Sequence, residues 1–110
     1  MTEISDHAKL VSALKHAALE APALTSPQLR QGASQRAAGG SAIDAPYDAM
    51  AKQIGEAAFR VTDEQVAAVV TAAGSEKAAF EIVAAAAVGA GLQRWGAGSK
   101  AFREAMDATA

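Results

Sequence analysis

The apolar and polar positions of this chain follow helical spacing almost throughout, most clearly from Val61 to Trp95. Apolar residues recur there every three or four positions, the spacing that one face of a helix requires. No segment of the sequence alternates strictly between apolar and polar residues, as a half-buried strand would. The pattern therefore predicts an all-α protein, a bundle of five to six helices.

The first helix of this stretch has clear start and stop signals. Thr62 and Gln65 stand at the spacing of a capping box, in which side chains satisfy the free N–H groups of the first turn. Gly74 follows the last apolar position, and glycine readily takes the left-handed conformation that ends a helix. Ser75 can then cap the next helix.

That next helix, at about residues 76–95, is rich in alanine and glycine and is apolar or small on nearly every side. Glu81 interrupts it, and the uninterrupted run 82–92 is too short to span a membrane. A helix that is apolar all round is normally buried all round. We therefore expect a central helix, with one stripe formed by Phe80, Val83, Ala84, Ala87, Val88, Gly91, Leu92 and Trp95 and the opposite side by Ile82, Ala85, Ala86, Gly89 and Ala90.

Caps and helix breakers predict the remaining helices. Residues 1–110 form one domain in this interpretation, with N-terminal helices in residues 1–40 and a core in residues 46–108. Proline suits the first helical turn and glycine the position after the last, which sets the boundaries. The expected helices run from a cap at Ser5 to Glu20, from Gln28 to Ala38 after Ser26-Pro27, from Pro46 to Arg60, and, after a break at Gly96-Ala97-Gly98, from a cap at Ser99 through Phe102 and Met106.

Composition indicates that the core is thin. Hydrophobic residues make up 51% of the 110 residues, and alanine supplies more than half of them. Alanine favours helix but buries little surface, so one subunit has few large side chains with which to stabilise itself. Association with other copies or with a partner protein is the natural remedy.

Charge and cysteine content exclude several classes of protein. The net charge of −2 argues against a nucleic-acid binder, and the absence of cysteine excludes disulfides and thiolate chemistry. His7 and His16, nine residues apart, lie on opposite sides of one helix and cannot share a metal. The N-terminus lacks the apolar segment of a secretory signal. We expect a cytoplasmic protein without metal, cofactor or membrane association.

Glu81 is the main candidate for chemistry, because a carboxylate in an otherwise apolar helix is costly to bury without a partner. In a functional interpretation it is a general acid or base with a raised pKa in a pocket between subunits. In a structural interpretation it is an ion-pair partner for Arg94, Arg36 or Arg60, or a half-exposed residue beside Lys77. The sequence leaves both open.

Arg94, Arg36 and Trp95 are the candidates for ligand binding. Arginine holds a carboxylate through two parallel hydrogen bonds, and Trp95 follows Arg94 directly. The alternative for Arg94 and Trp95 is packing, with the arginine favoured by the negative end of the helix dipole.

Residues 49–102 resemble the carboxymuconolactone decarboxylase and alkylhydroperoxidase D-like superfamily. The run V-T-D-E-Q-V-A-A-V-V-T-A-A-G is similar to its "VTDxDVxxLRxAG" pattern, and the following F-E-I and the arginine near the end of the helix also match. The resemblance implies an all-helical subunit that forms trimers or larger rings. The superfamily's redox members carry Cys-x-x-Cys and a nearby histidine, which this chain lacks. No catalytic residue can therefore be transferred, and peroxidase or disulfide reductase activity is not expected.

Three functional hypotheses follow. The first is an oligomeric accessory or partner-binding subunit without redox chemistry. The second is a thiol-independent decarboxylase or lactone-type enzyme acting on a small organic acid, with Glu81 as acid or base and Arg94 or Arg36 holding a carboxylate. The third is binding of a small carboxylate ligand without chemistry. We favour the first.

Overall fold

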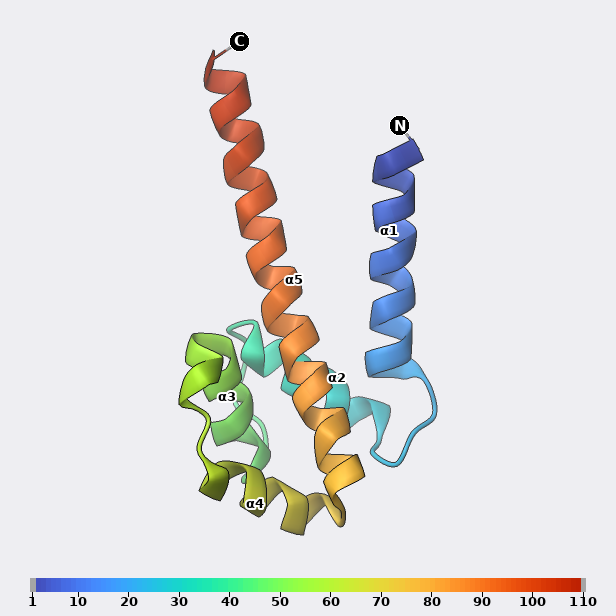
Figure 1. Ribbon diagram of the computed structural model, residues 1–110, viewed down its shortest axis with the longest axis vertical. Helices are drawn as coiled ribbons and strands as arrows, with labels where there is room; N and C mark the ends of the chain where they lie inside the picture. The colour runs from blue at the N-terminus through green and yellow to red at the C-terminus, as the bar shows by residue number, and fades with distance from the viewer. Residues whose placement is uncertain (1, 110) are drawn as a thin grey trace.

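The computed structural model describes the backbone of residues 2–109 and the side chains of residues 6–108. In this part of the chain, all regular structure is helical. Helices α2, α3, α4 and the first half of α5 pack into a base, from which α1 and the second half of α5 project on the same side (Figure 1). The elements are α1 (Thr2–Lys15), the π-helical turn η1 (His16–Glu20), α2 (Pro27–Ala37), α3 (Tyr47–Ala57), the 3-10 turn η2 (Ala58–Arg60), α4 (Asp63–Ala73) and α5 (Glu76–Thr109).

The strongest local signals in the sequence are confirmed. The Ser26 hydroxyl accepts a hydrogen bond from the Leu29 N–H at 3.1 Å, with Pro27 as the first residue of α2. In the capping box of α4, the Thr62 hydroxyl accepts from the Gln65 N–H at 3.1 Å, and the Gln65 side chain accepts from the Thr62 N–H at 3.0 Å. Gly74 ends α4 with a left-handed φ of 98°.

Two predicted boundaries are wrong. Helix α1 begins at Thr2, so Ser5 lies within the helix and is not its N-cap. Helix α5 continues through Gly96-Ala97-Gly98 to Thr109, so Ser99 caps no separate helix. A helical glycine costs only about 1 kcal/mol relative to alanine, and good helix formers on both sides of the triplet offset this cost.

Close contact between backbones builds the core of the base. A Cβ atom added to Gly55 of α3 would overlap the carbonyl oxygen of Ala37, and one added to Gly89 of α5 would overlap that of Ser34. Helix α2 thus lies directly against both α3 and α5, and small side chains fill the narrow space between them. The buried core consists of Ala33, Ala37, Met50, Ala51, Ile54, Val69, Ala79, Ile82, Ala86 and Ala90.

Within the protomer, α5 is buried on one side only. Its Ile82 side faces the base, whereas Phe80 and Trp95 on the other side are 68% and 60% exposed. The reason is steric, because the close approach of α2 leaves room only for the smaller face of the helix. The larger apolar residues therefore point outward.

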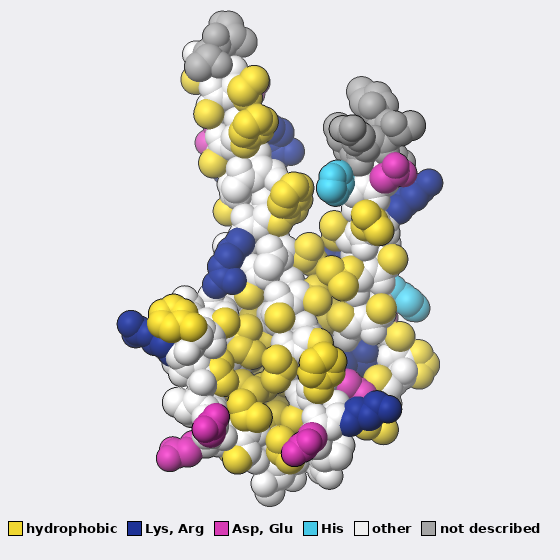
Figure 2. All heavy atoms as spheres, viewed as in Figure 1, with side chains coloured by type: hydrophobic (Ala, Val, Ile, Leu, Met, Phe, Trp, Pro, Cys, Tyr) yellow, Lys and Arg dark blue, Asp and Glu magenta, His cyan; other side chains and the backbone are white. Residues whose placement is uncertain are grey.

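The α1 helix and the second half of α5 stand apart (Figure 1). A groove lies between their side chains (Figure 2). The rings of His7 and Trp95 bridge the two helices, with their centroids 5.9 Å apart. The groove measures about 690 Å³, and apolar side chains such as Val11 and Leu92 line much of it. Among residues 2–109, none of the helices combines the length and the apolar composition needed to cross a bilayer.

Candidate functional site

Glu81 holds the segment that connects η1 to α2. One of its carboxylate oxygens accepts hydrogen bonds from the Thr25 N–H at 2.8 Å and the Thr25 hydroxyl at 2.7 Å, and the other accepts from the Leu24 N–H at 3.0 Å. The predicted partners of Glu81, which were Arg94, Arg36 or Arg60, are therefore wrong. The hydrogen-bond donors to Glu81 are mainly backbone N–H groups of a loop that packs on α5.

Arg30 holds the same connection from the side of α2, and sequence reasoning missed it. Its side chain is almost fully buried and donates to the carbonyl oxygens of Ala18, at 3.0 Å, and Ala21. A signal was present, because Arg30 is three and seven positions before the core residues Ala33 and Ala37 and so shares their face. Arg30 thus satisfies carbonyl groups at the end of η1 that the helix itself leaves unpaired.

The pKa of Glu81 is the opposite of what the functional interpretation requires. Partial burial by itself raises this pKa, but the hydrogen bonds from Thr25 and Leu24 and the nearby charge of Arg30 together outweigh that effect. The pKa of Glu81 therefore lies below the ordinary range of a glutamate. Such a group stays ionised at neutral pH and is suited to holding N–H donors, not to releasing a proton.

Arg36 joins α2 to α3 through Asp48. The Arg36 Nε atom lies 2.8 Å from Asp48 Oδ1, and its Nη1 donates to the Gly40 carbonyl at 3.0 Å. Asp48 also accepts from the Ile43 N–H at 2.9 Å, and this bond, followed by the Arg36 contact, lowers the pKa of Asp48. Asp48 thus anchors the loop between the two helices.

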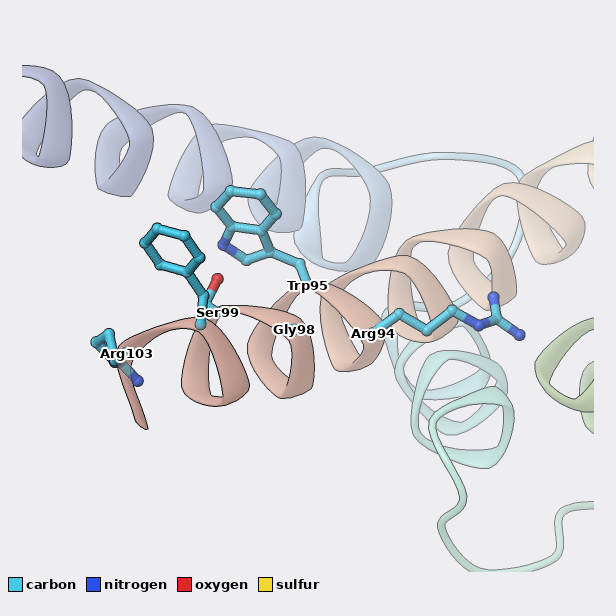
Figure 3. Close-up of a pocket in the computed structure, with 6 residues that line it drawn as sticks. Arg94, Trp95, Gly98, Ser99 and Arg103 are labelled. Carbon is cyan, nitrogen blue, oxygen red and sulfur yellow. The ribbon is translucent and has the colours of Figure 1, made fainter. Parts of the chain in front are cut away.

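Arg94 also contacts its own chain. Its Nη2 atom donates to the Gly55 carbonyl oxygen at 2.5 Å, near the end of α3. In Figure 3 the Arg94 side chain extends away from Trp95 and Ser99. A shallow hollow of about 330 Å³ beside Gly55 is lined by Arg36 and Lys52, so the structure brings Arg36 and Arg94 to two sides of one glycine.

Within one protomer, Glu81 and Arg94 are too far apart to act on one small molecule. They are 13 positions apart on α5, which is about 20 Å along a helix axis. The catalytic arrangement considered from the sequence, with Glu81 as acid or base and Arg94 as carboxylate clamp, is therefore not assembled within one protomer. Each side chain instead has its own structural contact.

The remaining feature is an apolar surface along α5. We call it the outer stripe and define it as Ala84, Ala87, Gly91, Trp95, Gly98, Phe102 and Met106, seven residues that share the side of α5 turned away from the base. Trp95, Phe102 and Met106 are 60%, 66% and 56% exposed. Figure 3 shows the rings of Trp95 and a neighbouring aromatic residue beside Ser99, at a hollow of about 380 Å³ whose lining is almost entirely apolar.

The histidines show no arrangement for metal binding. His16 is exposed and lies 3.2 Å from Glu20, one helical turn away, as a surface histidine would. Among the described side chains, no group of three or more His, Cys, Asp or Glu residues is close enough to hold a metal ion.

Comparisons of this chain with protein-family models, with characterised proteins and with solved structures found no match.

Proposed function

We propose that this protein is an oligomeric accessory or partner-binding subunit without redox chemistry, and that the outer stripe of α5 is its association surface. The observation that carries the proposal is the exposure of Trp95 and Phe102 on a helix whose opposite side is the core of the protomer. Large apolar side chains exposed together in a folded protein mark sites of contact with other molecules.

The contacts of the three charged candidates Glu81, Arg36 and Arg94 add support. Glu81, Arg36 and Arg94 each bond to backbone or side-chain groups of their own chain. Their contacts connect loops and helices, which is a structural role. The exposed apolar side chains of the outer stripe suit contact with another polypeptide.

The resemblance of residues 49–102 to the carboxymuconolactone decarboxylase and alkylhydroperoxidase D-like superfamily is consistent with the proposal, since it implies an all-helical subunit that forms trimers or larger rings. On this proposal the chain is a member without cysteine that has kept the helical scaffold and uses it for assembly. The thin, alanine-rich core is a physical reason for association, because association covers apolar surface that the protomer cannot bury.

Sedimentation equilibrium over the micromolar concentration range tests the proposal. We expect a mass above that of the monomer, and we expect Phe102→Ser to weaken the association. Phe59→Ser is the matched control, because Phe59 is 85% exposed but lies on η2, away from the outer stripe. A protein that stays monomeric throughout, or a control variant that weakens association as much as Phe102→Ser does, contradicts the proposal.

A further inference from the structure

The glycines of α5 differ in the space around them. Gly89 is required within the protomer, because a Cβ at this position would overlap the carbonyl of Ser34. Gly91, Gly96 and Gly98, in contrast, have open space around the position of an added Cβ. Each costs the helix about 1 kcal/mol relative to alanine, and nothing within the protomer offsets that cost.

Gly91 and Gly98 share one face of α5, because seven residues make almost two full turns. On this face they are interleaved with large side chains, so that the outer stripe alternates between Gly91, Trp95, Gly98 and Phe102. Glycine lets the backbone of a second helix come close, and an exposed aromatic ring needs a gap of this kind to fill. The stripe thus carries both protrusions and gaps.

We infer that the occupant of the outer stripe is the α5 helix of a second copy, packed antiparallel about a twofold axis between Gly96 and Ala97. In this register Phe102 lies opposite Gly91 of the second copy, Trp95 opposite Gly98, and Met106 opposite Ala87. Every large side chain then meets a small one, on both halves of the symmetric contact. A parallel pair would instead set Trp95 against Trp95 and leave the glycines facing each other.

The charges of α5 are compatible with this pairing. Lys100, Glu104 and Asp107 lie about 140° or more around the helix from Phe102, and Arg94 and Arg103, at about 80° and 100°, lie at the edge of the hollow beside Trp95, where their charged ends keep contact with water. In the antiparallel register Arg94 stands opposite Ser99, and Lys100 stands opposite Gln93. No like-charged side chains oppose each other, and no charge is stripped of water, which would be costly.

The exposed area is sufficient for a weak but specific dimer. Trp95 and Phe102 are 60% and 66% exposed, so each has about 100–150 Å² left to bury. Together with Met106, the alanines and the glycine backbone, two copies bury about 1,000 Å² in total, which is near the lower limit for a specific interface. The inference rests on the proposed function and adds the partner, the orientation and the register.

The test uses the glycines, because Gly91→Leu introduces no clash within the protomer and favours helix. In the antiparallel dimer it fills the gap that Phe102 needs, so we expect the dimer dissociation constant to rise at least about tenfold. Gly96→Leu is the matched control, since Gly96 also has open space around it but points about 140° away from Gly91. We expect Gly96→Leu to leave the dissociation constant unchanged.

A compensating variant tests the orientation. Gly91→Leu combined with Phe102→Ala again places a large residue opposite a small one in the antiparallel register, so we expect dimerisation to recover most of the loss. In a parallel pair Leu would still meet Leu at position 91, and recovery would fail. Circular dichroism checks that all variants keep their helix content.

The outcomes separate the two proposals. A wild-type protein that is monomeric at every concentration overturns both. If the wild-type protein associates but Gly91→Leu has no effect, if Gly96→Leu has an equal effect, or if the double variant does not recover, this inference fails and the proposed association surface stands.

Discussion

Thr25 is held by Glu81 through two hydrogen bonds to one carboxylate oxygen, from its N–H at 2.8 Å and from its hydroxyl at 2.7 Å. The two residues are 56 positions apart in the sequence. Because Arg30 holds the carbonyl groups of Ala18 and Ala21, the connection between α1 and the base is fixed from two sides. Glu81 and Arg30 together therefore position α1 on one side of the groove.

Replacing the Glu81 carboxylate should destabilise the fold. Glu81→Gln keeps the shape of the side chain but removes the charge that strengthens three hydrogen bonds, so we expect the free energy of unfolding to fall by about 1–2 kcal/mol. Chemical denaturation measures the change. Glu56→Gln, on the exposed side of α3, is the control and should change the free energy by less than about 0.5 kcal/mol. An equal loss in the two variants would show that the hydrogen bonds of Glu81 contribute nothing specific.

The contribution of Glu81 to stability should depend on pH in a defined direction. The pKa of Glu81 is lower in the folded protein than in the unfolded chain, so folding favours the ionised carboxylate. This contribution is complete above the unfolded pKa, near pH 4.3, and is lost as the pH falls through the folded pKa. We expect the difference in unfolding free energy between the wild type and Glu81→Gln to be constant at neutral pH and to shrink below about pH 4. A difference that grows on acidification would contradict the lowered pKa.

Two alanine substitutions on α5 should have opposite effects on stability. Gly89→Ala forces a Cβ against the Ser34 carbonyl, so we expect the free energy of unfolding to fall by about 1–3 kcal/mol. Gly96→Ala meets open space and should raise it by about 0.5–1 kcal/mol, because alanine favours helix. Thermal denaturation of both variants measures these changes in stability. A Gly89→Ala protein as stable as the wild type would show that α2 and α5 are not in backbone contact.

The parts of the fold that were predicted correctly depend on neighbours in the sequence. The contacts of Thr62 with Gln65, of Ser26 with Leu29 and of Gly74 with Val70 each lie within about one helical turn, so nearby residues alone specify them. The continuation of α5 through Gly96 and Gly98 was not predicted. Glycines favour the end of a helix, and whether the helix continues depends on helix-forming residues many positions away on both sides.

The orientation of α5 and the partners of Glu81 depend on tertiary contacts. Both sides of this helix are apolar, so periodicity could not indicate which side faces the base. Helix α2 determines which side of α5 faces the base, because its close approach at Gly89 leaves room only for small side chains. Glu81 was recognised as unusual, but its partners Leu24 and Thr25 are backbone donors of a loop, and backbone donors leave no mark in a sequence.

The central claim is that a second copy of this chain covers the outer stripe of α5, and the fluorescence of Trp95 tests it most directly. Trp95 is the only tryptophan of the chain and is 60% exposed in the protomer. The measurement is acrylamide quenching of Trp95 across a dilution series, compared with the mass from sedimentation at the same concentrations. We predict that quenching weakens and the emission shifts to the blue as the mass rises. Quenching that stays constant while the mass rises, or a mass that never exceeds the monomer, would contradict the claim.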